Sequence, residues 1–297
     1  MSTEWESRLT SWAKAPSVSE RERMENAERA IREAVGASAA LRAHSITVFP
    51  TGSFRNRTHV RQESDVDISV LCTDSMHLYL PATMTRSQVG LSEEPAAYTA
   101  AMFRADLQAA LNDHFGEATV RAGNKAFDIH ENSYRVDADV VACFDYRHYF
   151  DNGTFHLGTA VLPKMGGFIA NYPKQHYDNG YAKHQATQER YRKMVRCLKN
   201  LAGDMADADI PIARETASFL IESLVWNVPD DFFNRGSYKA DMREILAHTF
   251  NATLSDEACK GWVETNGVKY LFHISQPWTR EKAHSFLSAA WDYMGLE

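Results

Sequence analysis

Hydrophobic and polar residues alternate with two different periods along the chain. Apolar residues three or four positions apart predict helices over residues 5–35, 98–115, 187–205, 217–226 and 281–293. Short apolar runs and alternating stretches predict strands over residues 46–49, 65–71, 118–121, 126–130 and 134–144. Ser17, followed three residues later by Glu20, has the pattern of a capping box and predicts a helix start there. Residues 73–94, which contain Pro81 and Gly90, are predicted to form a loop. The first half is therefore expected to combine strands with helices, and the second half to be mostly helical.

Two small residues and two acids flank the connection between the first two strands. Gly52 and Ser53 follow the apolar run 46–49, and Asp65 and Asp67 open the next strand. Residues i and i+2 of a strand point to the same side, roughly 6–7 Å apart. Carboxylates placed in this way can bridge divalent cations about 3.5–4 Å apart, and Mg²⁺ prefers such oxygen ligands. Glycine lets the backbone approach a phosphate closely, and the Ser53 hydroxyl adds a donor.

Each of these signals has a plain structural alternative. A Gly-Ser pair is most often a turn, and an Asp-x-Asp pattern is most often a solvated strand edge. A third carboxylate on a later strand favours the metal site. Asp137 and Asp139 share one face of the strand 134–144, and Asp139 is preferred because it directly precedes the apolar run from Val140. A carboxylate beside the metal can also help to take the proton of an attacking hydroxyl.

Composition narrows the class of protein. The chain has 297 residues, 44% hydrophobic and 24% charged, which is typical of a globular protein with one large domain or two lobes around a shared core. No run reaches the ~18 apolar residues of a membrane span, and the polar N-terminus does not resemble a signal peptide, so a cytoplasmic protein is expected. Four cysteines without CxxC spacing predict buried thiols instead of a zinc site or disulfides. The net charge of −7 argues against broad binding to nucleic acid.

A group of cations lies in and just before the predicted helix 187–205. Its members are Lys183, Arg190, Arg192, Lys193, Arg196 and Lys199. The sequence leaves two interpretations open. The group is either the solvated face of a core helix, or it contains one or two cations that neutralise a bound triphosphate.

Several motifs resemble one known family. The order Gly-Ser, Asp-x-Asp and a distant Asp is similar to that of polymerase-β-like nucleotidyltransferases. Closer matches are GSFRNRTHVR at 52–61 with SDVD at 64–67, ADVV at 138–141, NYPKQHYDNG at 171–180, and SFLIE at 218–222 with WNVP at 226–229. They resemble the bacterial CD-NTases of CBASS antiphage systems, relatives of cyclic GMP–AMP synthase and oligoadenylate synthase, and among these the clade called CdnE. The resemblance covers nearly the whole chain.

The resemblance implies an α+β fold, with a polymerase-β-like nucleotidyltransferase core that has a mixed sheet and with a helical C-terminal lobe. The catalytic lobe is expected over residues 1–165 and the helical lobe over residues 166–297. The two lobes are expected to form one compact unit with the active site between them.

The same resemblance implies the chemistry. Asp65, Asp67 and Asp139 would bind two Mg²⁺ ions, with Mn²⁺ as a substitute. Two ribonucleoside triphosphates would be joined into a cyclic dinucleotide with release of pyrophosphate. The product would be a second messenger in antiphage defence, read by a downstream cyclic-dinucleotide-sensing effector, and neither a membrane nor an extended nucleic acid is an expected partner. The candidate contacts to the nucleotide phosphates are Gly52, Ser53, Lys183 and Lys193.

Asn171 is the candidate that selects the base. In the CdnE clade, an asparagine at the start of the NYP motif is associated with pyrimidine nucleotides, whereas purine-selecting relatives often carry serine. An amide offers one acceptor and two donors, which fit O4 and N3–H of uracil but equally N6 and N7 of adenine. A turn residue before Tyr172 is the structural alternative. With the resemblance, we expect a product that contains uridine, cyclic UMP–AMP or cyclic di-UMP, made with UTP and ATP as the favoured substrates.

Two other functions stay open at this point. One is a nucleotidyltransferase that makes linear oligonucleotides or modifies RNA or protein. The other is a non-catalytic nucleotide-binding module, which is expected to lack part of the acid set, whereas Asp65, Asp67 and Asp139 are all present.

Overall fold

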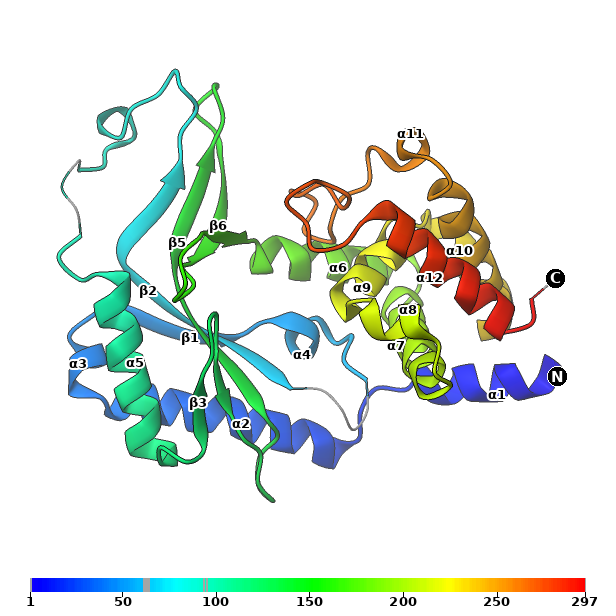
Figure 1. The fold of residues 1–297 in the computed structure, drawn as a ribbon, viewed down its shortest axis with the longest axis horizontal. Coiled ribbons are helices and arrows are strands. Elements are labelled where there is room, and N and C mark those ends of the chain that lie inside the picture. The colour runs from blue at the N-terminus through cyan, green and yellow to red at the C-terminus, as the bar shows by residue number, and fades with distance from the viewer. Residues whose placement is uncertain (1, 61–64, 93, 95, 297) are drawn as a thin grey trace. The chain divides into compact units, whose positions relative to one another are not determined.

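The computed structural model describes residues 2–60, 65–92, 94 and 96–296 (Figure 1). Its contacts divide the chain into two compact units. The sheet unit is formed by Ser17–Arg55 and Glu63–Pro173, and the helical unit by Met1–Pro16, Asn56–Gln62 and Lys174–Glu297. The described residues 56–60, which follow the Gly-Ser motif and precede the first two acids in the sequence, therefore belong by their contacts to the helical unit.

One mixed sheet forms the centre of the sheet unit. Its strands are β1 (Ile46–Pro50), β2 (Val66–Tyr79), β3 (Val120–Ala122), β4 (Phe127–Ile129), β5 (Ala138–Tyr149), β6 (Phe155–Val161) and β7 (Ile169–Asn171). They are ordered β1-β2-β5-β4-β3, and β6 pairs with both β5 and β7. β2 runs parallel to β5, and the other pairs among these strands are antiparallel. The predicted α+β class with a mixed sheet is confirmed.

Alternation along the two central strands decides which side of the sheet is covered by helices. On β2, Val66 and Ile68 are fully buried, whereas Asp67 between them is half-buried. On β5, Phe144 packs edge to face on Phe103 of α5 (Ala100–Phe115), with 5.4 Å between ring centroids. α5 and α2 (Val18–Ala37) thus contact the apolar side of the sheet. The opposite side, which carries Asp67, is called the acid face below.

The helices of the sheet unit begin and end where the sequence indicated. The predicted capping box is confirmed at α2, because the Ser17 hydroxyl accepts a hydrogen bond from the backbone N–H of Glu20 and the Glu20 carboxylate accepts one from the backbone N–H of Ser17. Gly116 ends α5 with a positive φ of 83°. The remaining short helices of this part of the chain are α3 (Ala39–Arg42), α4 (Gly52–Asn56) and the 3₁₀ turn η1 (Ser87–Val89).

The prediction of a loop from residue 73 was wrong for its first part, because β2 continues to Tyr79. The register of β2 against β5 shifts between Cys72 and Met76, so that extra residues of β2 lie opposite consecutive residues of β5. This irregularity interrupts the alternation of apolar and polar residues on which the prediction depended. β6 and β7 were not predicted at all.

The strand predicted over 134–144 exists, but it begins later, at Ala138. Side chains in the preceding segment bind the backbone groups that a strand would use. The Asn132 carboxamide oxygen accepts hydrogen bonds from the N–H groups of Tyr134 and Arg135, and the Asp137 carboxylate accepts one from the N–H of Glu131. Such local bonds compete with strand pairing and explain the delayed start.

The helical unit is built from α-helices around one apolar core. They are α1 (Ser2–Trp12), α6 (Pro173–Ala186), α7 (Tyr191–Asp207), α8 (Pro211–Glu215), α9 (Ser218–Trp226), α10 (Tyr238–Ala252), α11 (Asp256–Cys259) and α12 (Arg280–Tyr293), with a 3₁₀ turn η2 (Asp230–Phe232). The core gathers fully buried side chains such as Leu198, Leu224 and Phe286 from three of these helices. The predicted helices over 217–226 and 281–293 are confirmed, whereas α6 was not predicted.

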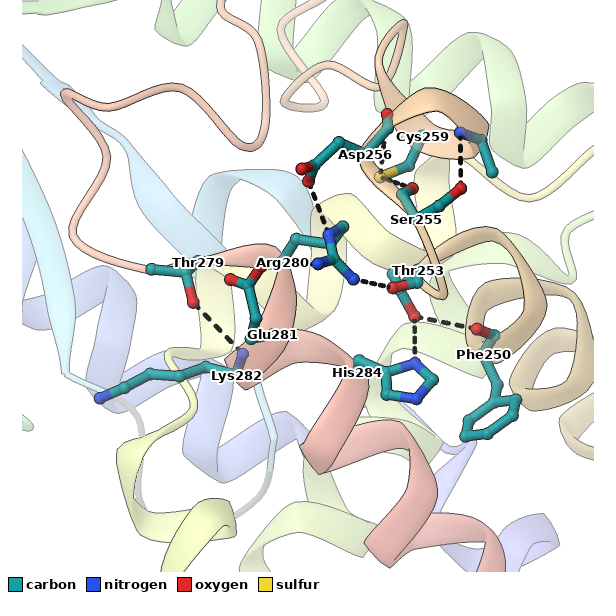
Figure 2. A network of polar contacts seen from close by, with 11 residues as sticks. Phe250, Thr253, Ser255, Asp256, Cys259, Thr279, Arg280, Glu281, Lys282 and His284 are labelled. Atoms are coloured by element: carbon teal, nitrogen blue, oxygen red, sulfur yellow. Dashed lines mark hydrogen bonds and ion pairs between the residues drawn. The ribbon is translucent and has the colours of Figure 1, made fainter.

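One arginine ties the end of α10 to α11 and to the start of α12 (Figure 2). The Arg280 guanidinium donates to the Thr253 carbonyl oxygen and to the Asp256 carboxylate, at 2.6 Å in both cases. The Thr253 hydroxyl in turn lies 3.0 Å from Nδ1 of His284. The bond to Thr253 satisfies the carbonyl group of the residue that caps the C-terminus of α10.

The structure also shows the state of the cysteines and the character of the helices among the described residues. Cys72, Cys143, Cys197 and Cys259 are buried free thiols, as predicted. Within these residues, no helix combines the length and the apolar character that crossing a membrane requires.

Candidate active site

Two of the predicted acids lie directly opposite each other on the acid face. Asp67 of β2 and Asp139 of β5 are register partners in the parallel pair, and neighbouring strands lie about 4.8 Å apart. Asp65 precedes Asp67 by two residues and comes just before the start of β2. The sheet pairing thus brings together residues that are far apart in the sequence.

Burial and like charges together raise the pKa values in this acid group. Burial raises the pKa of the Asp139 carboxyl to about 6, and the charges of Asp67 and Asp65 add to the effect. The pKa of Asp65 is also raised, by partial burial and by the charges of Asp137 and Asp128. Carboxylates that repel one another in this way favour a bound cation, because a cation removes the repulsion.

Sequence reasoning missed one acid at this place. Asp128 of β4 is the register partner of Asp139 on the side away from Asp67, so the row Asp67–Asp139–Asp128 crosses three neighbouring strands. The alternation of buried Phe127 and Ile129 around Asp128 was visible in the sequence. What the sequence did not show was the strand order, which decides that β4 lies beside β5.

Gly52 lies against the carboxylate of Asp67. Its φ of +59° favours glycine, and a Cβ atom added there would lie 1.8 Å from Oδ2 of Asp67. The preceding Thr51 donates its backbone N–H to the carbonyl oxygen of Asp67 at 2.8 Å. Gly52 and Ser53 begin the short helix α4, where the sequence suggested a turn. Glycine is therefore required here by the close approach of the backbone to an acid.

The carboxylate oxygens of the three predicted acids are ligands of the type that a hard divalent cation binds. Asp65, Asp67 and Asp139 supply only carboxylate oxygens, the ligands that Mg²⁺ and Mn²⁺ prefer. Among the described residues, no three side chains of the metal-binding types already converge as a closed ligand cluster. A cation would be held by these acids in an arrangement open to other oxygen ligands, which is usual for Mg²⁺ with a phosphate substrate.

Asn171 ends strand β7 on a position fixed by strand pairing. It is exposed, and it is the register partner of Thr159 in β6. At Gly158 a Cβ atom would lie 2.5 Å from the Asn171 carbonyl oxygen, so the two strands approach closely there. The turn alternative for Asn171 is therefore wrong: the residue belongs to the edge of the sheet.

The two candidate lysines belong to the helical unit. The Lys183 ammonium donates to the Val228 carbonyl oxygen at 2.6 Å and pairs with the Asp230 carboxylate at 2.7 Å. Lys193 is half-buried, and its charge contributes with burial and neighbouring arginines to lowering the pKa of His184 to about 4. Lys183 is thus paired with η2, whereas Lys193 lies near other charges of α6 and α7. The contact of either lysine with a phosphate stays a prediction.

The interpretation of the α7 cations as a solvated face was wrong for three of them. Arg192, Arg196 and Lys199 are only 4%, 6% and 8% exposed. The Lys199 ammonium lies 3.3 Å from the Glu222 carboxylate, and Arg196 donates to the carbonyl oxygen of Arg57 at 2.7 Å. Much of this charge therefore holds the helical unit together.

Glu222 is the centre of a buried polar network that the sequence did not indicate. Its two oxygens accept from the Thr58 hydroxyl at 2.6 Å and lie 2.8 Å from Nε2 of His176. Thr58 and Arg57 belong to the short piece that leads from α4 toward the acids, and Arg57 has a positive φ of 58°. The network therefore anchors this connection to α7 and α9.

Comparison with known proteins identifies the relatives of this chain. Residues 178–295 match the family model of the cGAS/DncV-like nucleotidyltransferase C-terminal helical domain. The chain is 40% identical over 297 residues to the cyclic dipyrimidine nucleotide synthase CdnE of Legionella pneumophila, which covers 99% of both chains. It is 30% identical to a cyclic dipurine nucleotide synthase of Elizabethkingia meningoseptica, over 98% of this chain and 99% of the relative.

Solved structures show the same fold. The structure of the Rhodothermus marinus CdnE c-UMP-AMP synthase with Apcpp and Upnpp superposes with a TM-score of 0.85 at 29% identity, over 98% of this chain and 96% of that chain. The Elizabethkingia meningoseptica CdnE cyclic dinucleotide synthase with GTP and Apcpp gives a TM-score of 0.82 at 29% identity, over 98% of each chain. Proteins named for pyrimidine and for purine products thus share this fold, so the fold alone does not determine the base.

Proposed function

The chain belongs to the CdnE clade of the cGAS/DncV-like nucleotidyltransferases, and from this premise we propose that it joins two ribonucleoside triphosphates into a cyclic dinucleotide that contains uridine. The observation that carries the proposal is the register pair Asp67–Asp139, with the backbone of Gly52 packed against Asp67. By the family resemblance, the product is expected to act as a second messenger in antiphage defence and to be read by a separate effector.

The proposed role of the acids is to hold the metal ions at the site. Asp65, Asp67 and Asp139 would hold two Mg²⁺ ions, with Mn²⁺ as a substitute. Bound there, the cations neutralise negative charge on the phosphoryl group and its leaving pyrophosphate. Asp139, which lies in the acid row, would also help to take the proton of an attacking ribose hydroxyl. Gly52 and Ser53 offer backbone and hydroxyl donors to the phosphates.

Asn171 would read the base at the far end of the acid face. Its amide can donate to O4 of uracil and accept from N3–H. The Legionella pneumophila relative, at 40% identity, is named a cyclic dipyrimidine nucleotide synthase, which supports a pyrimidine over a purine at this place. The preferred products are cyclic UMP–AMP and cyclic di-UMP.

Pyrophosphate release tests the proposed reaction and its metal requirement together. Purified protein with UTP, ATP and Mg²⁺ is expected to release one pyrophosphate for each nucleotide joined. Removal of the metal with EDTA should reduce the rate to background, and Mn²⁺ should restore it. Release that continues in EDTA would contradict the role of the acids, and release that does not depend on UTP would contradict the uridine assignment.

The variant Asn171→Ser is expected to shift base choice from uridine toward purines. A serine hydroxyl is shorter than the amide and offers one donor instead of two, so it loses the bond that the amide NH2 donates to O4. A site that binds a base by hydrogen bonds discriminates strongly against a partner that leaves them unmade. The measurement is the ratio of uridine to purine in the product, by mass spectrometry, and an unchanged ratio would remove Asn171 from base selection.

A further inference from the structure

A second polar row crosses the acid face near the other end of β5. Asp145 of β5 is the register partner of Thr159 in β6, and Thr159 is the register partner of Asn171 in β7. Register partners point to the same side of a sheet, so the three side chains share one face. Asp145 is six residues beyond Asp139 on the same strand, an even number, which places this row on the acid face as well.

The two rows lie at different positions along β5, and a different role is proposed for each. Six residues of β-strand span about 20 Å. The row at Asp139 carries the acids proposed for the phosphate chemistry, and the row at Asp145 contains Asn171, the residue proposed to read the base. A nucleotide lying along the acid face with its phosphates at the first row therefore has its base toward the second.

Asp145 has a carboxylate without a protein partner. Its side chain is half-buried, and none of the described residues forms a hydrogen bond or an ion pair with it. Burial raises the pKa of this carboxyl, while the charge of Arg147 partly opposes the shift. The Arg147 guanidinium itself donates to the Tyr149 hydroxyl at 3.2 Å and lies over the Phe155 ring.

The Asp145 carboxylate is an available acceptor on this face. It is only half-buried, and a carboxylate without a protein partner can accept a hydrogen bond from a ligand. Thr159, between Asp145 and Asn171, has no hydrogen bond from its hydroxyl to another described residue. Two neighbouring polar side chains on one row thus have unused hydrogen-bonding capacity beside the exposed Asn171.

We propose that Asp145 is a second base-selecting residue, whose carboxylate accepts the N3–H hydrogen bond of a uracil in place of the Asn171 amide oxygen, while the Asn171 amide NH2 donates to O4. The inference rests on the proposed function of Asn171. A carboxylate is an acceptor only, so it attracts the ring N–H of uracil and repels the N3 lone pair of cytosine. Asp145 thereby favours the binding of uracil over cytosine. An asparagine alone discriminates poorly between these two bases, because its amide offers both a donor and an acceptor.

The test compares UTP and CTP as substrates of Asp145→Ala and Asp145→Asn. In Asp145→Ala, KM for UTP is expected to rise about tenfold to a hundredfold, the range for losing a hydrogen bond to a charged group, while KM for ATP stays unchanged. In Asp145→Asn, an amide can accept from uracil or donate to cytosine, so use of CTP relative to UTP is expected to rise about tenfold. Asp113→Ala, on the exposed side of α5, is the matched control.

The outcomes distinguish this inference from the function on which it rests. If the wild-type protein uses UTP and both Asp145 variants keep its preference for UTP over CTP, Asp145 does not select the base and the proposed function stands. A loss that is equal for UTP, CTP and ATP, with a lowered melting temperature, would assign Asp145 to folding and overturn the inference. If the wild-type protein uses purines only, the uridine assignment fails and the inference fails with it.

Discussion

The variant Asp67→Asn is expected to lose at least about a thousandfold in kcat, the upper range for removing one group that stabilises the transition state electrostatically. Asp67 is the register partner of Asp139 and lies against Gly52, so it is at the centre of the proposed site. The carboxamide keeps the shape of the side chain but loses the charge that holds a cation. The rate of pyrophosphate release at saturating nucleotide is the measurement.

Stability provides the control for Asp67→Asn. The charge of Asp67 helps to raise the pKa of Asp139, so its removal relieves repulsion when no metal is bound. The variant should therefore unfold at the same temperature as the wild-type protein or at a higher one. Asp113→Asn, at an exposed position of α5, should change neither quantity. Activity that persists in Asp67→Asn would show that the metal-site assignment is wrong.

The variant Glu222→Ala is expected to reduce the free energy of unfolding of the helical unit by about 3–5 kcal/mol, the usual result of breaking a buried ion pair from one side. Glu222 is 3% exposed, and its removal leaves the Lys199 ammonium, 8% exposed, without its carboxylate. It also removes the acceptor of the Thr58 hydroxyl. Urea unfolding followed by circular dichroism measures the change.

A surface variant and measurements at several pH values provide controls for the Glu222→Ala experiment. Glu257→Ala removes an exposed carboxylate that pairs with Lys260 and should change the free energy by less than about 0.5 kcal/mol. Burial alone would raise the pKa of Glu222, but Lys199 and His176 lower it from 4.5 to about 2. The stabilisation is therefore present above pH 4.5 and lost as the pH falls toward 2. A difference between wild type and Glu222→Ala that does not shrink over this range would contradict the network.

Local signals in the sequence were sufficient to predict elements whose ends and periodicity are set by neighbouring residues. α2 has its capping box at Ser17, and α5 has its helical period and a terminal Gly116, so both were predictable from neighbouring residues. The acids Asp67 and Asp139 were also predictable, because each opens a strand that becomes apolar directly afterwards. Their pairing required only that the two strands be neighbours.

What the sequence did not indicate depends on contacts between distant segments. Asp128 joins the acid row only because β4 pairs with β5. Asn171 could be read as a turn residue because the three-residue strand β7 is defined by its pairing with β6 and has no period of its own. The burial of Lys199 follows from Glu222 on another helix, and a helical pattern alone assigns such a cation to the solvent.

The formation of a cyclic dinucleotide that contains uridine is tested most directly by incubating the purified protein with all four ribonucleoside triphosphates and Mg²⁺, treating the products with phosphatase, and identifying them by mass spectrometry. We expect a phosphatase-resistant cyclic product with at least one uridine, cyclic UMP–AMP or cyclic di-UMP. A cyclic product of purines alone would contradict the assignment of the base, and linear products alone would contradict the cyclisation itself.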